Sequence, residues 1–294
     1  FWMGMSFFPS RKRCCPECCW RKIELKGEEG IEYYHRGVVF YLAGFPIAMP
    51  LDVEMILPGE DEVAAARRLL LRVLKPYGRF FDVVLTDALY FGAPFVNFCT
   101  DQGKEVILVL KAEKRLLFQD AQGLFSQMKP LTWKEPGLGI RAWDAEGFTS
   151  AEGIEVPLRV LRTQEVITRR RRRGKGWVQE KETHHWEWVT TLPAARLSSC
   201  LLWQIGHARW EVENDLFHTL ATYWSLDHCF RHEPTAILNF TLTLFIAFVL
   251  LQSFYLGNLK PERRAHLTFI AIAQELLCAL AIMDRFAPWL RRGG

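Results

Sequence analysis

The chain has 294 residues, of which half are hydrophobic and 24% are charged, and its formal net charge is +4. This length suffices for one large domain or two, and eight cysteines in so long a chain exclude a disulfide-stapled scaffold. The mild basic charge is compatible with DNA binding but does not require it.

The N-terminal segment carries no recognisable export signal. Its apolar stretch, residues 1–8, is short, and Arg11-Lys12-Arg13 follows this stretch instead of preceding it. We therefore expect a reducing, cytoplasmic setting. Because the chain does not begin with methionine, we also expect that its natural start lies upstream or that the N-terminus was cut.

Four cysteines crowd into residues 14–19. Cys15-Pro16-Glu17-Cys18 has the ligand spacing of half a zinc site, in which His35 could supply a third ligand and Cys14 or Cys19 a fourth. No second cysteine pair follows, so free thiols are favoured, and zinc at Cys15 and Cys18 is the alternative.

Residues 37–57 predict strands interrupted by Gly44 and Pro46, and residues 61–74 predict a helix with an acidic first turn. A β-branched and aromatic run from Phe81 predicts a buried strand that closes with Asp87. A helix near residues 95–99 and a strand at residues 106–110 follow. In open α/β sheets the chemistry collects at the carboxyl ends of strands, which makes Asp87 a candidate ligand for a divalent metal.

From residue 129 to residue 192 the pattern alternates with period two and predicts antiparallel strands. This region contains five consecutive arginines followed by a lysine, and we predict that they contact DNA phosphates; these residues are Arg169, Arg170, Arg171, Arg172, Arg173 and Lys175. The alternative is a solvated loop. Trp186 and Trp188 share one strand face and are expected in the core, with stacking on an extruded base as the alternative.

After Pro193 the pattern is helical to the C-terminus. Trp210, Phe217 and Leu220 form the apolar stripe of a predicted helix, and Arg209 and Glu213 share its neighbouring face at i,i+4 spacing. Glu213 is either a metal ligand oriented by Arg209 or one half of a surface ion pair.

Two features further along are open to two interpretations each. His228 and His232 also stand at i,i+4 spacing, but Pro234 follows, so helix-end packing or capping is favoured. Residues 237–256 are apolar over the length of a membrane span, although a fully buried core helix fits the same pattern.

Taken in order, these segments resemble the DDE transposases of bacterial insertion sequences, in the group with an Arg-x-x-x-Glu helix. The segments that carry the resemblance are Cys15-Pro16-Glu17-Cys18, Glu32-Tyr33-Tyr34-His35-Arg36, Pro58-Gly59-Glu60-Asp61-Glu62, Asp87-Ala88-Leu89-Tyr90, the strand at residues 106–111, Arg209 to Leu220, and Asp227-His228-Cys229-Phe230-Arg231-His232.

The resemblance implies an α/β fold, an RNase H-like mixed sheet with helices that a β-rich insertion interrupts. We divide the chain into residues 1–128, the first part of this core, residues 129–196, the insertion, and residues 197–294, the helical completion that carries Glu213. The resemblance further implies metal-dependent cleavage and transfer of DNA strands, with two Mg²⁺ or Mn²⁺ ions held by Asp87 and Glu213 and with Arg209 as a catalytic residue. The expected partners are double-stranded DNA and a second copy of the chain, with no membrane, and the expected location is the bacterial cytoplasm, on the nucleoid when DNA is bound.

The chain departs from the family pattern at three positions. Gly206 and Leu220 stand where a tyrosine and a lysine are usual, and Met3 stands where the first aspartate is expected. Methionine is a poor ligand for magnesium or manganese, and Asp52 lies closer to Asp87 in sequence than the pattern allows. Three hypotheses follow: an active transposase, an inactive remnant that binds DNA or the intact enzyme, and a membrane-associated protein built around residues 237–256.

Overall fold

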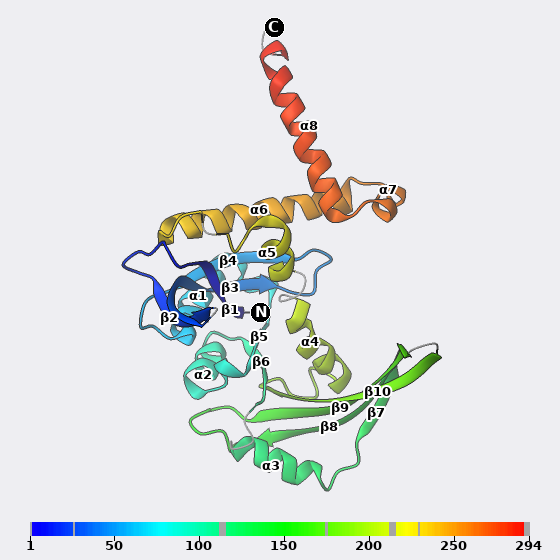
Figure 1. The fold of residues 1–294 in the computed structure, drawn as a ribbon. Coiled ribbons are helices and arrows are strands. Elements are labelled where there is room, and N and C mark those ends of the chain that lie inside the picture. Colours follow the sequence, from blue (N-terminus) through cyan, green and yellow to red (C-terminus); the bar gives the residue numbers. More distant parts are fainter. Residues whose placement is uncertain are drawn as a thin grey trace.

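The structure, a computed structural model, describes residues 2–25, 27–111, 116–173, 176–211, 216–228 and 230–290. The chain forms a mixed α/β fold with two sheets, which meet where strand β1 lies beside strand β5 (Figure 1).

The first sheet is antiparallel and comes from the N-terminal part of the chain. Its strands are β1 (Trp2–Ser10), β2 (Cys19–Leu25), β3 (Glu28–Leu42) and β4 (Met49–Ile56). The long β3 pairs with the other three strands. The strands predicted for residues 37–57 are therefore the second half of β3 and β4. The turn between them contains Gly44 at φ +89°, a conformation that side chains rarely adopt.

The second sheet begins with two parallel strands. The elements of this part are α1 (Glu62–Tyr77), η1 (Gly78–Phe80), β5 (Val83–Thr86), η2 (Ala88–Tyr90), α2 (Ala93–Asp101) and β6 (Glu105–Val109). Asp61 caps α1 by accepting the N–H of Ala64 at 2.7 Å, and Pro94 lies in the first turn of α2, where no N–H is needed. The two helices and two strands predicted for this part are confirmed.

An antiparallel meander continues this sheet. Its elements are α3 (Leu116–Phe125), β7 (Leu131–Glu135), β8 (Leu138–Phe148), β9 (Leu158–Arg173) and β10 (Gly176–Thr190). The prediction of a β-rich region is confirmed. β10 also pairs with β6, so the sheet runs without a break from the parallel strands into the meander. The domain boundaries after residues 128 and 196 remain predictions.

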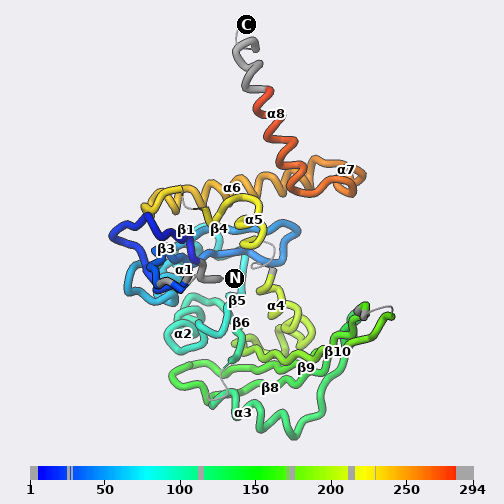
Figure 2. Tube along the Cα trace, viewed as in Figure 1, coloured from blue at the N-terminus to red at the C-terminus, as the bar shows by residue number. Residues whose placement is uncertain are grey.

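The C-terminal part is helical, as predicted. It comprises α4 (Ser199–Glu211), α5 (His218–Trp224), α6 (Pro234–Gly257), α7 (Pro261–His266) and α8 (Phe269–Leu290). α6 lies along β4, and α8 extends away from the body of the molecule (Figures 1 and 2).

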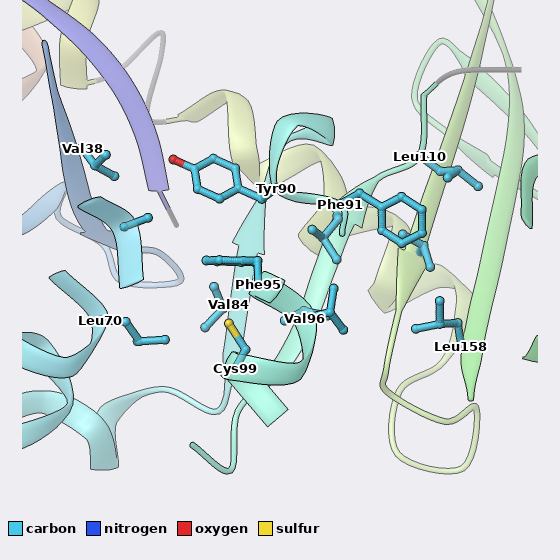
Figure 3. Close-up of a cluster of buried hydrophobic side chains, with 14 of the residues drawn as sticks. Val38, Leu70, Val84, Tyr90, Phe91, Phe95, Val96, Cys99, Leu110 and Leu158 are labelled. Carbon is cyan, nitrogen blue, oxygen red and sulfur yellow. The ribbon is translucent and has the colours of Figure 1, made fainter. Parts of the chain in front are cut away.

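Two clusters of buried hydrophobic side chains lie on opposite faces of the sheets, and each cluster draws residues from both sheets. One cluster contains Leu70, Val84 and Phe95 and packs α1, α2 and α3 against one face (Figure 3). The other contains Leu85 and Trp188 and packs α4, α5 and α6 against the opposite face. Neighbouring residues of β5 enter different clusters because successive side chains of a strand point to opposite faces. This arrangement confirms the RNase H-like mixed α/β fold.

The long apolar helix α6 differs from expectation. Within the described residues it is the one helix long and apolar enough to cross a membrane by length and composition, yet only 28% of its most apolar window is buried. Phe245 and Phe248 pack into the core, whereas Ile246 and Leu250 are more than 60% exposed. The interpretation as a fully buried core helix is therefore wrong: α6 covers the sheet with one face and leaves an apolar face outside.

Candidate functional site

Asp87 lies at the carboxyl end of β5, as predicted. Its side chain is half-buried, and Oδ1 accepts the N–H of Leu89 at 2.8 Å, which caps the short helix η2. No described basic side chain forms an ion pair with it. Strand β1 lies beside β5, near the N-terminus of the chain (Figure 1).

Acidic side chains on β4 and at the start of α1 are, in contrast, neutralised by arginines. Arg72 bonds Asp52 at 2.6 Å, and Arg68 bonds both Glu54 and Glu60, which holds the pKa of Glu60 below its usual range. Asp52 is also separated from β5 by β3 and β1. Its carboxylate is therefore unsuited to serve in place of the aspartate that the resemblance predicts at position 3.

Glu62 has a structural role in the core beneath the site. It accepts hydrogen bonds from the hydroxyl of Tyr90 and from Arg36, both at 2.8 Å. Burial, with the nearby Glu62 carboxylate adding to it, raises the pKa of Tyr90 far above its usual value. Tyr90 therefore stays protonated and anchors η2, the segment that follows Asp87.

Helix α4 packs against β5 and β6 and carries Arg209 in its last turn. The guanidinium carbon of Arg209 lies 5.7 Å from the ring centre of Trp210. Glu213, the predicted second metal ligand, lies outside the described residues. The predicted apolar stripe is buried at Phe217 and Leu220, and a lysine at position 220, which the resemblance predicts, would be fully buried here.

A buried polar cluster, which sequence reasoning missed, anchors α4 to the meander. Glu165 on β9 is 4% exposed and bonds Trp203 Nε1 at 2.7 Å, His207 Nε2 at 2.8 Å and Thr163 Oγ1 at 3.1 Å. Burial acts to raise the pKa of Glu165, but these hydrogen bonds outweigh it and hold that pKa below the usual range. The signal in the sequence was the i,i+4 spacing of Trp203 and His207 on one helix face.

The same helix explains the glycine at position 206. A Cβ atom at Gly206 would overlap the indole ring of Trp188, so a tyrosine cannot occupy this place. Trp188 is 1% exposed and Trp186 packs edge-on against Trp210 with ring centres 4.6 Å apart. Both tryptophans therefore belong to the core, as predicted, and Trp188 has no free face for a base.

The arginine run lies on a two-stranded ribbon, formed by the ends of β9 and β10 beyond the last β8 pair at Ile167. Arg169, Arg170 and Arg172 are exposed there; the side chains of Arg171 and Arg173 and the whole of Lys175 lie outside the described residues. From Thr168 to Glu182, both included, the sequence has seven basic and two acidic residues.

The two faces of this ribbon differ in charge. Arg169 lies 3.8 Å from Glu182 on one face. On the other face Arg172 pairs across the strands with Trp177, which is 66% exposed, and Arg170 pairs with Gln179. The exposed side chain of Trp177 adds an aromatic group to this face of the ribbon, which the sequence analysis did not predict.

Far from Asp87 in sequence, a second group of side chains has the chemistry of metal ligands. Cys15, Cys18, His35 and His232 bring their ligand atoms within 4.8 Å of one another. The fourth member of this group is His232, and not Cys14 or Cys19. His232 is buried just before the start of α6, which agrees with the predicted helix-end packing. Burial raises the pKa of Cys18 to about 11, and burial together with His232 lowers the pKa of His35.

Comparison with known families matches residues 34–250 to the model described as Transposase DDE domain. A comparison with curated proteins finds no match.

Proposed function

Because the chain belongs to the Transposase DDE domain family, we propose that it is a metal-dependent DNA transposase that cleaves and joins strands at the ends of an insertion sequence. The observation that carries this proposal beyond family membership is the packing of α4 on β5. It brings the helix that precedes Glu213 against the strand that ends at Asp87.

Asp87 suits a divalent ion because its carboxylate is partly open to solvent and has no described cationic partner. Together with Glu213 it would hold Mg²⁺ or Mn²⁺. When bound, two such ions activate water or a 3′-hydroxyl group and stabilise the leaving oxygen.

The chain's own groups would position these ligands. The N–H of Leu89 holds one oxygen of Asp87 in place. Arg209, one turn before Glu213, has a planar fork that suits both a carboxylate and a phosphate oxygen. The buried Glu165–His207 contact fixes the angle at which α4 meets the sheet.

We assign duplex DNA binding to the ribbon of β9 and β10. A two-stranded ribbon fits the major groove of B-DNA, and arginines on it would neutralise phosphates. The ribbon projects from the sheet in Figure 1, so a duplex can approach it without meeting the core. This location on DNA implies work in the cytoplasm, on the nucleoid.

A homodimer in the DNA complex is part of the proposal. α6 and α8 expose large apolar side chains, among them Leu250, Leu277 and Leu280, each at least 62% exposed. Single apolar side chains are common on surfaces, but α6 and α8 contact each other and both carry exposed ones, which favours a protein partner. Light scattering of the chain with and without DNA measures this directly.

A second candidate, an inactive DNA-binding remnant, rests on Met3. Met3 lies in β1, the strand beside β5, and its backbone pairs with Val39 of β3. If the third carboxylate of the metal site belongs on this strand, methionine leaves the site one charge short.

Nicking of a supercoiled plasmid that carries the DNA flanking the gene, in Mn²⁺, tests both candidates. Cleavage that Asp87→Ala abolishes supports the active enzyme. Cleavage only after Met3→Asp supports the remnant. If neither the chain nor Met3→Asp cleaves or binds the plasmid, the transposase proposal fails.

A further inference from the structure

We propose that Cys15, Cys18, His35 and His232 form a structural zinc site, separate from the strand-cleavage site. Two thiols and two imidazoles are the donor set of tetrahedral structural zinc. Four protein ligands would close the coordination sphere and leave no position for a substrate, so the site has a structural role.

The spacing of the ligand atoms fits a tetrahedron. Zinc–sulfur and zinc–nitrogen bonds of about 2.3 and 2.0 Å imply S···S and S···N edges of about 3.8 and 3.5 Å. Cys15 and Cys18 Sγ are 3.5 Å apart, and His35 Nε2 is 3.4 and 3.5 Å from them. Cys18 Sγ and His232 Nδ1 are 2.8 Å apart, so zinc would widen this one edge by several tenths of an ångström.

The contact of His232 with the backbone of Phe8 determines which ring nitrogen is available to zinc. His232 Nε2 lies 2.8 Å from the backbone oxygen of Phe8, and a carbonyl oxygen can only accept. Nε2 therefore carries the proton, and Nδ1 directs its lone pair at the thiols. This arrangement, a ligand histidine that donates its other N–H to a carbonyl, is typical of metal sites.

Backbone strain supports this contact. Phe8 is a buried residue with φ +49°, in the left-handed region that non-glycine residues rarely adopt, and it lies at the irregularity where β1 loses register with β3. A strained residue persists only where its surroundings hold it, and here the strain turns its carbonyl toward His232.

The remaining ligands are also oriented. His35 Nε2 faces both thiols, at 3.4 Å from Cys15 Sγ and 3.5 Å from Cys18 Sγ. Within the Cys15–Cys18 turn, the N–H of Cys15 donates to Cys18 Sγ at 3.0 Å, and the N–H of Cys18 donates to the oxygen of Cys15 at 3.2 Å. An N–H directed at a sulfur stabilises a thiolate, the form that binds zinc.

The proposed zinc would join segments that the sequence keeps apart. Cys18 and His232 are 214 positions apart. The turn between β1 and β2, strand β3, and the segment before α6 meet at this point. The ion would therefore fasten α6 to the sheet whose edge strand, β1, lies beside β5, and an open recess lined partly by Cys15 and His232 gives it access.

Metal analysis of the full chain, purified without a histidine tag or chelator, tests the site. We expect about one zinc ion per chain, and after exchange to Co²⁺ an absorption spectrum typical of tetrahedral thiolate coordination. Removal of zinc should lower the temperature of unfolding, and its return should restore it.

Matched variants locate the ligands. Cys18→Ser and His232→Ala should lose zinc, whereas Cys19→Ser and His228→Ala, in the same two segments, should keep it. Equal zinc content in all four variants would overturn the proposal. The proposal would also be overturned if the chain bound neither zinc nor cobalt and only six of its eight cysteines reacted as thiols after denaturation. Two unreactive cysteines would indicate a Cys15–Cys18 disulfide. The metal content of the unaltered chain decides the matter if a variant fails to fold, and DNA cleavage plays no part in any of these readouts.

Discussion

Glu187 on β10 makes the stability of this protein depend on pH in a direction opposite to that of most carboxylates. It is 7% exposed, one oxygen lies 3.1 Å from Arg162 Nε, and the other is buried without a hydrogen-bond partner among the described residues. Burial raises its pKa to about 7, against the opposing effect of Arg162.

The magnitude follows from linkage. An unfolded glutamate has a pKa of about 4.3, so between about pH 4.3 and pH 7 the folded chain binds one proton more than the unfolded chain, and unfolding becomes easier as pH rises. From pH 5 to pH 8 the loss of unfolding free energy from this group is about 2.5 kcal/mol.

Glu187→Gln removes the titration but keeps the shape and an oxygen for Arg162. We therefore expect the variant to gain about 2.5 kcal/mol relative to the unaltered chain on going from pH 5 to pH 8. Urea unfolding of both proteins at the two pH values measures this double difference, in which constant effects of the substitution cancel. A difference near zero, or one of opposite sign, would refute a raised pKa at Glu187.

Three further predictions concern the parts around the site. Glu165→Ala should destabilise the fold by about 3 kcal/mol in urea unfolding, because His207 and Trp203 lose a buried acceptor, and Glu165→Gln should lose less. The folded pKa of Glu165 is lowered, so its stabilisation should be present above about pH 4.3 and vanish as pH falls further, a dependence that Glu165→Ala should lack. Gly206→Ala should lower unfolding free energy by about 1 to 3 kcal/mol through overlap with Trp188, and an unchanged midpoint would mean that the helix shifts freely. Replacing Arg170 and Arg172 with alanine should reduce the slope of log affinity for B-DNA against log salt by up to about 1.8, whereas Arg169→Ala, which removes a partner of Glu182, should change it less; equal slopes in all proteins would favour a solvated loop.

Local pattern was enough to predict the elements that carry Asp87. The β-branched and aromatic run of β5, the acidic start of α1 and the proline at the start of α2 are properties of neighbouring residues, and the elements they predict were confirmed. The position of Asp87 at a strand end followed from the same local pattern.

Features built by distant residues could not be predicted in this way. His232 lies beside Cys18 only because the chain returns to the first sheet after the whole meander. The i,i+4 spacing in sequence pointed to His228 instead. Glu165 occupies an inward position of a strand and looked like an ordinary polar residue until α4 supplied its partners. Hydropathy placed α6 to within three residues at each end, but a hydropathy pattern contains no information on which face of a helix another element covers.

If the ribbon of β9 and β10 binds DNA as proposed, the pairing of β10 with β6 would also fix a distance along the duplex. Trp188 pairs with Val109, next to the strand that ends at Asp87, and Trp177 lies eleven positions earlier on the same strand. At about 3.3 Å per residue the two points are about 36 Å apart, which is close to one helical turn of B-DNA. A duplex lying along both would present the same side to the ribbon tip and to Asp87. The distance between the bound sequence and the cut would then be set by the length of one strand, and inserting a pair of residues into each arm of the ribbon would move the two out of phase.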